Sequence, residues 1–247
     1  MECGINDSLL NNALNLSNSG ESYLFTLQKL RILCNRFPNI KYVFLEVTDN
    51  VFKKNFNKCY YADEYISNRF HLLGSSFSIR DHLFVFTKNP KGYFNATAIL
   101  IRKNIELIFT KKSKNLQELG GFKSLDNILT KEKMEEIKLN IKSNPSIPAR
   151  ESHSLIYLNQ ILDFCKKSSL KIAFVRSPQN KHYNELFGHE NFKLILDEKF
   201  QDIDFLDFND SIRNDNLFAD LEHLNKHGAK EYTNMFKRQI IHLELNQ

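Results

Sequence analysis

Asp220 and His223 are the residues of this chain whose types and spacing point most directly to chemistry. A carboxylate three residues before a histidine, in a loop, can hold one imidazole nitrogen while the other nitrogen takes a proton from a nucleophile. The chain contains eight histidines, so such a spacing also arises by chance. The plain alternative is a capping aspartate beside an exposed histidine.

The elements around this pair favour the chemical interpretation. The apolar segment IDFLDF at 203–208 predicts a last strand, and the amphipathic run from about 226 to 242 predicts a closing helix. The pair therefore lies in the loop between the last strand and the last helix. We expect such a loop to present both side chains to one cleft.

The residues that follow the pair carry a family resemblance. The segment resembles the terminal block of SGNH hydrolases, also called GDSL hydrolases, through Asp220, His223, Leu224, Asn225, Gly228 and Ala229. This resemblance implies a bacterial esterase or acyltransferase with Ser-His-Asp chemistry and no cofactor. In it His223 is the general base and Asp220 is its orienting partner.

Two further family blocks are matched less closely. NLSNSGESYLFTLQKL resembles the second block, which assigns Gly20 an oxyanion-hole N–H, although Gly20 could equally serve only to turn the chain into a helix. The third block, Gly-x-Asn-Asp, is represented by Glu46 to Asn50 without its glycine. Asn50 or Asp49 then supplies the polar group, and a helix cap or Asx-turn is the alternative role.

The first block, Gly-Asp-Ser, is absent from its expected place after a first strand. Asn6-Asp7-Ser8-Leu9 imitates it, but the five residues MECGI that precede it are too few for a buried strand to hold a nucleophile. We therefore expect Ser8 to be an ordinary loop or helix-start residue. The nucleophile is expected just upstream of Met1.

The pattern of apolar segments predicts an α/β fold. Strands are expected at 12–17, 40–47, 170–177 and 203–208, and helical stripes follow them. We expect a single domain over 1–247 with a doubly wound, mostly parallel sheet, a flavodoxin-like three-layer arrangement.

Residues 51–150 interrupt this alternation with aromatic, polar-interrupted segments and a charged run, KEKMEEIKLNIK. We expect a mainly helical insertion that packs over the carboxyl ends of the strands as a lid or substrate wall, because ligands of open α/β sheets bind there. Asn50 and His223 would then open into the same cleft.

Composition limits the possible partners. Cys3, Cys34, Cys59 and Cys165 form no C-x-x-C pair, so we expect reduced thiols and no metal site. The net charge of +5 is spread along a chain rich in Lys, Asn, Ile and Phe, which A/T-rich codons explain, so nucleic-acid binding is not expected. No membrane segment or signal peptide is visible. The chain as written is expected in the cytoplasm, with association with the cell envelope if an N-terminal piece is missing.

Two functions follow. The first is an esterase or O-acyltransferase that acts on an acyl ester, above all an acetyl ester, of a carbohydrate or small molecule. The second is a hydrolase-fold protein without catalysis that binds carbohydrate or a protein partner. The missing Gly-Asp-Ser and the altered third block favour the second.

Overall fold

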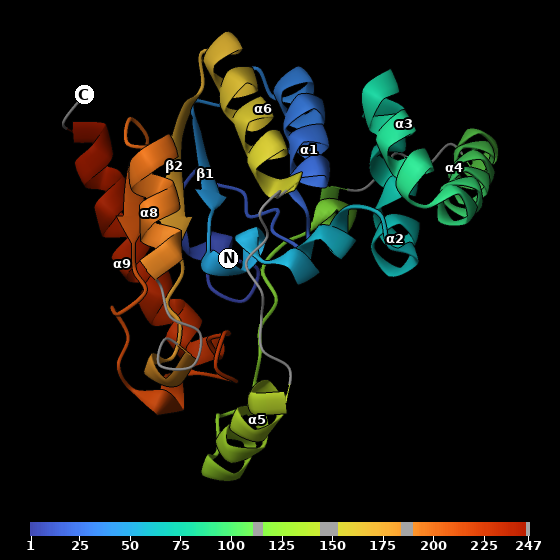
Figure 1. Cartoon of the computed structure of the whole chain (residues 1–247). Coiled ribbons are helices and arrows are strands. Elements are labelled where there is room, and N and C mark those ends of the chain that lie inside the picture. Colours follow the sequence, from blue (N-terminus) through green and yellow to red (C-terminus); the bar gives the residue numbers. More distant parts are fainter. Residues whose placement is uncertain (111–115, 144–152, 184–189, 246–247) are drawn as a thin grey trace.

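Three parallel strands form the sheet in the computed structural model, which describes residues 1–110, 116–143, 153–183 and 190–245. The strands are β1 (Tyr42–Glu46), β2 (Lys171–Arg176) and β3 (Asp204–Asp207), and they lie in the order β1-β2-β3. Segments that are more than 100 residues apart thus lie side by side (Figure 1). The protein is a mixed α/β protein, and the predicted strands near 40–47, 170–177 and 203–208 are confirmed.

Helices pack on both faces of this sheet. Leu45, Phe174 and Phe205 are aligned across the strands and face a core shared with α1 (Tyr23–Arg36), α6 (His153–Lys167) and α8 (Glu190–Lys199). The side chains on the other face, such as Phe44 and Val175, pack against α9 (Lys226–Leu245). In Figure 1, α1 and α6 lie on one side of the strands and α9 on the other.

The prediction of a strand at 12–17 is wrong, because side chains rather than a neighbouring strand form hydrogen bonds with the backbone of this segment. Asp7 accepts from the Asn15 N–H at 2.9 Å, and the Asn15 side chain accepts from the Ser17 N–H at 2.9 Å. The Lys29 ammonium donates to the Leu16 carbonyl at 2.8 Å. Asparagine side chains often bond to nearby backbone in this way, which competes with a sheet ladder.

The described part of the segment between β1 and α6 is made of helices. Short 3-10 helices η2 (Asp49–Phe52) and η3 (Lys54–Tyr60) lead into α2 (Asp63–Leu73), η4 (Gly74–Ser76), α3 (Ile79–Lys88) and α4 (Pro90–Thr110). The chain then forms η5 (Leu116–Leu119) and α5 (Lys131–Ser143). Residues 111–115 and 144–150 of the predicted insertion lie outside the described residues.

This segment occupies two places relative to the sheet. Helices α2, α3 and α4 lie beyond α1, to the right in Figure 1. Helix α5 lies past the carboxyl ends of the strands, at the bottom of the same view, and Met134 and Ile137 pack against the core under α9. Only the later part of the insertion therefore lies at the edge where the lid was expected.

Two short 3-10 helices complete the described chain, η1 (Asp7–Leu9) against α9 and η6 (Asp215–Leu217) before it. Within the described residues, no helix is both long enough and apolar enough to cross a membrane. The four cysteines are free thiols; Cys34 is partly exposed and the other three are buried.

Candidate functional site

The loop that carries Asp220 and His223 is a tight hairpin between η6 and α9. Phe218 and Leu224 form an antiparallel bridge across it, and the Ala219 N–H donates to the His223 carbonyl at 2.8 Å. Phe218 and Leu224 are both buried in the core under α9. The apolar ends of the loop thus anchor it, and the polar residues between them project outward.

Asp220 holds its loop and the imidazole together. One carboxylate oxygen, Oδ1, accepts from the backbone N–H groups of Glu222 and His223, both at 2.8 Å. The His223 Nδ1 lies 3.0 Å from Oδ1 and 2.9 Å from Oδ2, which fixes Nδ1 as the donor while Asp220 is ionised. The arrangement directs the other ring nitrogen, Nε2, away from Asp220.

Both side chains remain open to solvent, 41% exposed for His223 and 32% for Asp220. The hydrogen bond to Asp220 raises the pKa of His223 above 6.5, and partial burial only opposes this. Burial acts to raise the pKa of Asp220, but hydrogen bonds from His223 and from the backbone N–H groups outweigh it and lower that pKa. The pair is therefore a base that is oriented and accessible.

The other residues of the terminal block have structural roles in the same loop. Asn225 caps α9, because its side-chain oxygen accepts from the N–H groups of His227 and Gly228, both at 3.1 Å. At Gly228 an added Cβ would lie 2.2 Å from the Leu217 carbonyl oxygen. This close approach of helix and loop admits only glycine.

Asn50 follows the carboxyl end of β1 and contacts the loop of the pair through Glu222. Its Nδ2 donates to the Glu222 carboxylate at 3.1 Å, and Glu222 directly precedes His223. Its Oδ1 accepts from the Tyr183 hydroxyl at 2.8 Å and from the Lys53 ammonium at 2.7 Å. Asp49, the alternative third-block residue, is buried and paired with Lys53 at 2.8 Å.

Glu46 and Ser177 also lie at this edge, at the ends of β1 and β2, and Ser177 donates to Glu46 at 2.5 Å. Burial acts to raise the pKa of Glu46, but the Met1 ammonium, the Ser177 hydroxyl and the charge of His223 lower it overall. Sequence reasoning named Glu46 only as the start of the third-block segment, and it missed Ser177, Lys53, Tyr183 and Glu222 as site neighbours. For Glu46 and Ser177 the available signal was their position at strand ends, where polar groups gather.

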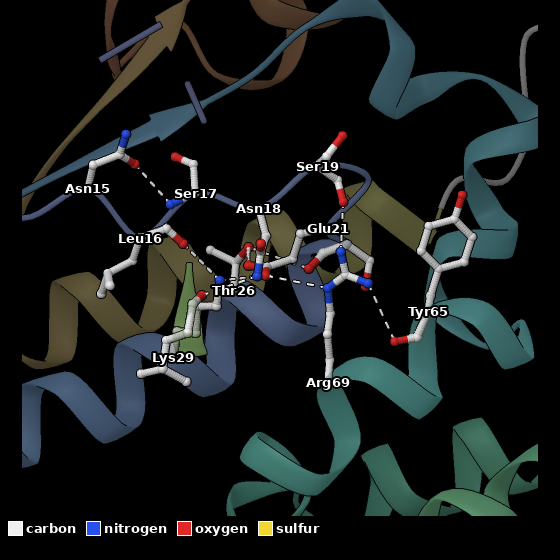
Figure 2. A network of polar contacts seen from close by, with 12 residues as sticks. Asn15, Leu16, Ser17, Asn18, Ser19, Glu21, Thr26, Lys29, Tyr65 and Arg69 are labelled. Carbon is white, nitrogen blue, oxygen red and sulfur yellow. Dashed lines mark hydrogen bonds and ion pairs between the residues drawn. The ribbon is translucent and has the colours of Figure 1, made fainter. Parts of the chain in front are cut away.

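Gly20 lies between Ser19 and Glu21, in a loop that buried charges hold in place; Figure 2 shows the contacts of Ser19 and Glu21 with Arg69. Its φ of +62° is a left-handed conformation, and an added Cβ would lie 2.9 Å from the Tyr65 ring. Arg69 from α2 donates to the Ser19 carbonyl at 2.7 Å and lies 3.7 Å from Glu21, which also pairs with Lys29 at 2.5 Å.

The Gly20 turn lies at the same edge of the sheet as the pair, because the hydroxyl of Tyr23, three residues on, donates to the Glu46 carbonyl at 2.9 Å. Among the described residues, no hydrogen bond or ion pair joins Gly20 to Asp220 or His223. The oxyanion role of Gly20 stays a prediction.

Ser8 lies in η1, where its hydroxyl donates to the Asn6 side chain at 2.7 Å. The neighbouring Asn6 N–H donates to Thr233 of α9 at 3.0 Å. Within the part of the chain that the structure describes, no group of three His, Cys, Asp or Glu side chains could hold a metal ion.

Comparison with family models places this chain in a family. Residues 116–244, just over half of the 247 residues, match the model of an uncharacterised protein family, and the chain belongs to that family. The matched span includes α5, α6, all of β2 and β3, and the Asp220–His223 loop. No curated protein and no solved structure matches the chain.

Proposed function

We propose that this protein is an SGNH-type esterase or O-acyltransferase that acts on an acyl ester, above all an acetyl ester, of a carbohydrate. One observation carries the proposal: Asp220 binds Nδ1 of an exposed His223 through both carboxylate oxygens, so Nε2 is oriented to accept a proton. A surface capping aspartate would bond only to backbone, whereas Asp220 bonds to backbone and imidazole together.

In the proposed reaction a serine hydroxyl adds to the acyl carbonyl while His223 Nε2 takes the hydroxyl proton. The tetrahedral adduct collapses, the carbon–oxygen bond to the sugar breaks, and the imidazolium returns the proton to the leaving alcohol. Water then attacks the acyl-serine in an esterase, and a second alcohol attacks it in an acyltransferase. His223 serves as base and then acid in both halves.

The distribution of helices supports a flavodoxin-like, doubly wound assignment. The connections β1-α6-β2 and β2-α8-β3 move in one direction across the sheet, and both helices pack on one face. Helix α9, which follows β3, packs on the other face. In a doubly wound sheet, the strands on one side of the switch point have this arrangement, and ligands bind at the carboxyl ends of the strands.

The proposal requires a serine nucleophile, which the family resemblance places in a Gly-Asp-Ser block. Among the described residues, no hydroxyl or thiol is hydrogen-bonded to His223. Ser8 bonds to Asn6, and Ser177 bonds to Glu46.

The second candidate, a hydrolase-fold protein that binds carbohydrate or a protein partner without catalysis, is favoured by one contact. The Asn50 amide, which would stabilise an oxyanion, donates to the Glu222 carboxylate at 3.1 Å. A carboxylate next to an oxyanion site repels the charge that develops there. The esterase therefore requires Glu222 to rotate away from Asn50 when substrate binds.

Hydrolysis of a chromogenic acetyl ester by four proteins side by side tests the proposal. They are the present chain, its Ser8→Ala variant, a chain extended upstream through Gly-Asp-Ser, and His223→Ala in that extended chain. We expect turnover by the extended chain alone. An inert extended chain that still binds carbohydrate would support the second candidate, and turnover by the present chain that Ser8→Ala removes would make Ser8 the nucleophile.

A further inference from the structure

Helices α3 and α4 carry a large exposed apolar surface. Of the fifteen large hydrophobic side chains that are exposed among the described residues, eight lie on these two helices. They are Ile79, Leu83 and Phe86 on α3, and Phe94, Ile101, Ile105, Ile108 and Phe109 on α4. Two of them are more exposed than any other large hydrophobic of the described chain, Phe109 at 83% and Ile79 at 79%.

The two stripes meet where the helices adjoin, since the rings of Phe86 and Phe94 pack edge to face with centroids 5.7 Å apart. A fully exposed aromatic side chain has about 200 Å² of surface, and isoleucine has somewhat less. The eight side chains together therefore expose an apolar area that approaches the ~800 Å² that each partner buries in a stable dimer. They exceed the ~300–600 Å² of the largest apolar patch on a typical monomer.

The α4 stripe has the spacing of a coiled-coil seam. Phe94, Ala98, Ile101, Ile105 and Ile108 follow one another at intervals of four, three, four and three residues. The opposite side of α4 is already occupied, because Gly92 and Ala96 are buried against the rest of the protein. A seam of this kind accepts a second helix, and knobs from that helix fit between its side chains.

We propose that α4 pairs antiparallel with α4 of a second copy of this chain, with the α3 stripe completing the interface. This inference is independent of the proposed esterase function. Antiparallel pairing that sets Ile101 against Ile105 of the second copy also sets the small Ala98 against the large Ile108. A small side chain of one copy then faces a large side chain of the other, so the two helix faces are complementary in volume.

The same register brings opposite charges together. Arg102 and Glu106 are exposed on one border of the seam, and the opposite border holds the uncharged Thr97 and Asn104. In the antiparallel pair, Arg102 of one copy lies about 3 Å along the axis from Glu106 of the other, from a rise of ~1.5 Å per residue. Glu106 now pairs with Lys103 at 3.4 Å, and both side chains are about half exposed, so this contact can be exchanged.

Sedimentation velocity of the full chain tests the proposal. We expect a species of twice the 29.0 kDa chain mass at micromolar concentration, which the double variant Ile101→Glu, Ile105→Glu converts to monomer. The matched control is Ile156→Glu with Leu194→Glu, on α6 and α8, because these side chains are exposed to 57% and 56%. The control should remain dimeric. A monomeric wild-type chain, including one that co-sediments with phosphatidylglycerol vesicles instead, would overturn the proposal.

Charge exchange tests the orientation. Arg102→Glu and Glu106→Arg should each weaken self-association roughly tenfold, because each sets like charges opposite one another. A mixture of the two variants should form a mixed dimer of near wild-type affinity, since both of its cross-pairs are again opposite in sign. Failure of the mixture to associate more tightly than either variant alone would contradict the antiparallel register.

Discussion

Two clusters in this protein each join a carboxylate to basic side chains, but they differ in burial. Lys29, Glu21 and Arg69 form a network whose side chains are 5%, 7% and 12% exposed. Asp220 and His223 form a pair that is 32% and 41% exposed. The buried network holds the Gly20 loop to α1 and α2, and the exposed pair leaves a basic nitrogen facing solvent. Burial therefore separates the cluster that holds a loop in place from the pair that we propose as a base.

The buried network gives the largest expected effect on stability. Glu21→Gln removes the one carboxylate that Lys29 and Arg69 share, and the loss of one partner from a buried ion pair costs about 3–5 kcal/mol of unfolding free energy. Urea unfolding measures it. Asp126→Asn, which breaks an exposed ion pair with Lys226, is the control and should cost less than about 1 kcal/mol. Equal losses of unfolding free energy in the two variants would show that burial does not strengthen the Glu21 network.

A smaller loss is expected where the site loop meets α9. Gly228→Ala places a methyl group 2.2 Å from the Leu217 carbonyl, so loop and helix must separate, at a cost of about 1–3 kcal/mol. Thermal unfolding checks this against Lys230→Ala, a change at an exposed position of the same helix. If Gly228→Ala were neutral, the glycine of the terminal block would have no packing role here.

The exposed pair should contribute a small, pH-dependent stabilisation. Because the pKa of His223 is raised above 6.5 and that of Asp220 is lowered below 3.8, the pair is fully charged between these two values. Its stabilisation is present between 3.8 and 6.5, is lost as pH rises through the raised pKa of His223, and is lost as pH falls through the lowered pKa of Asp220.

Asp220→Asn should therefore destabilise the protein near pH 5.5 and have less effect near pH 9, and it should lower the pKa of His223 in an NMR titration. Asp202→Asn, an exposed aspartate outside the site, should change neither quantity. A His223 pKa that is the same in Asp220→Asn and in the unaltered chain would show that the pair does not form in solution.

The sequence predicted those parts of the molecule that local pattern determines. Segments such as IKYVFLEV gave the strands, and helical spacing gave α1, α6 and α9, because apolar periodicity reflects which face is buried. The segment NALNLS imitated a strand, but Asn15 and Asp7 bind its backbone groups instead. That outcome depended on partners within the same loop, which periodicity does not report.

For the site, strand ends placed Asn50 and His223 at one edge, and the structure links them through Glu222. The contact of Tyr183 with Asn50 could not be predicted in the same way, because 133 residues separate the two in the sequence. The four-three spacing of the α4 seam is present in the sequence, but only its exposure among the described residues distinguishes it from a helix face packed in the core.

The pH dependence of acetyl-ester hydrolysis by the chain extended through Gly-Asp-Ser tests most directly whether Asp220 and His223 act as a catalytic pair. We predict that kcat/KM rises with pH as His223 loses its proton, with a midpoint above 6.5. Asp220→Asn should move the midpoint to lower pH and reduce the plateau, and His227→Ala should change neither. A profile whose midpoint Asp220→Asn leaves in place, or a rate that persists in His223→Ala, would contradict the assignment of this pair as the base.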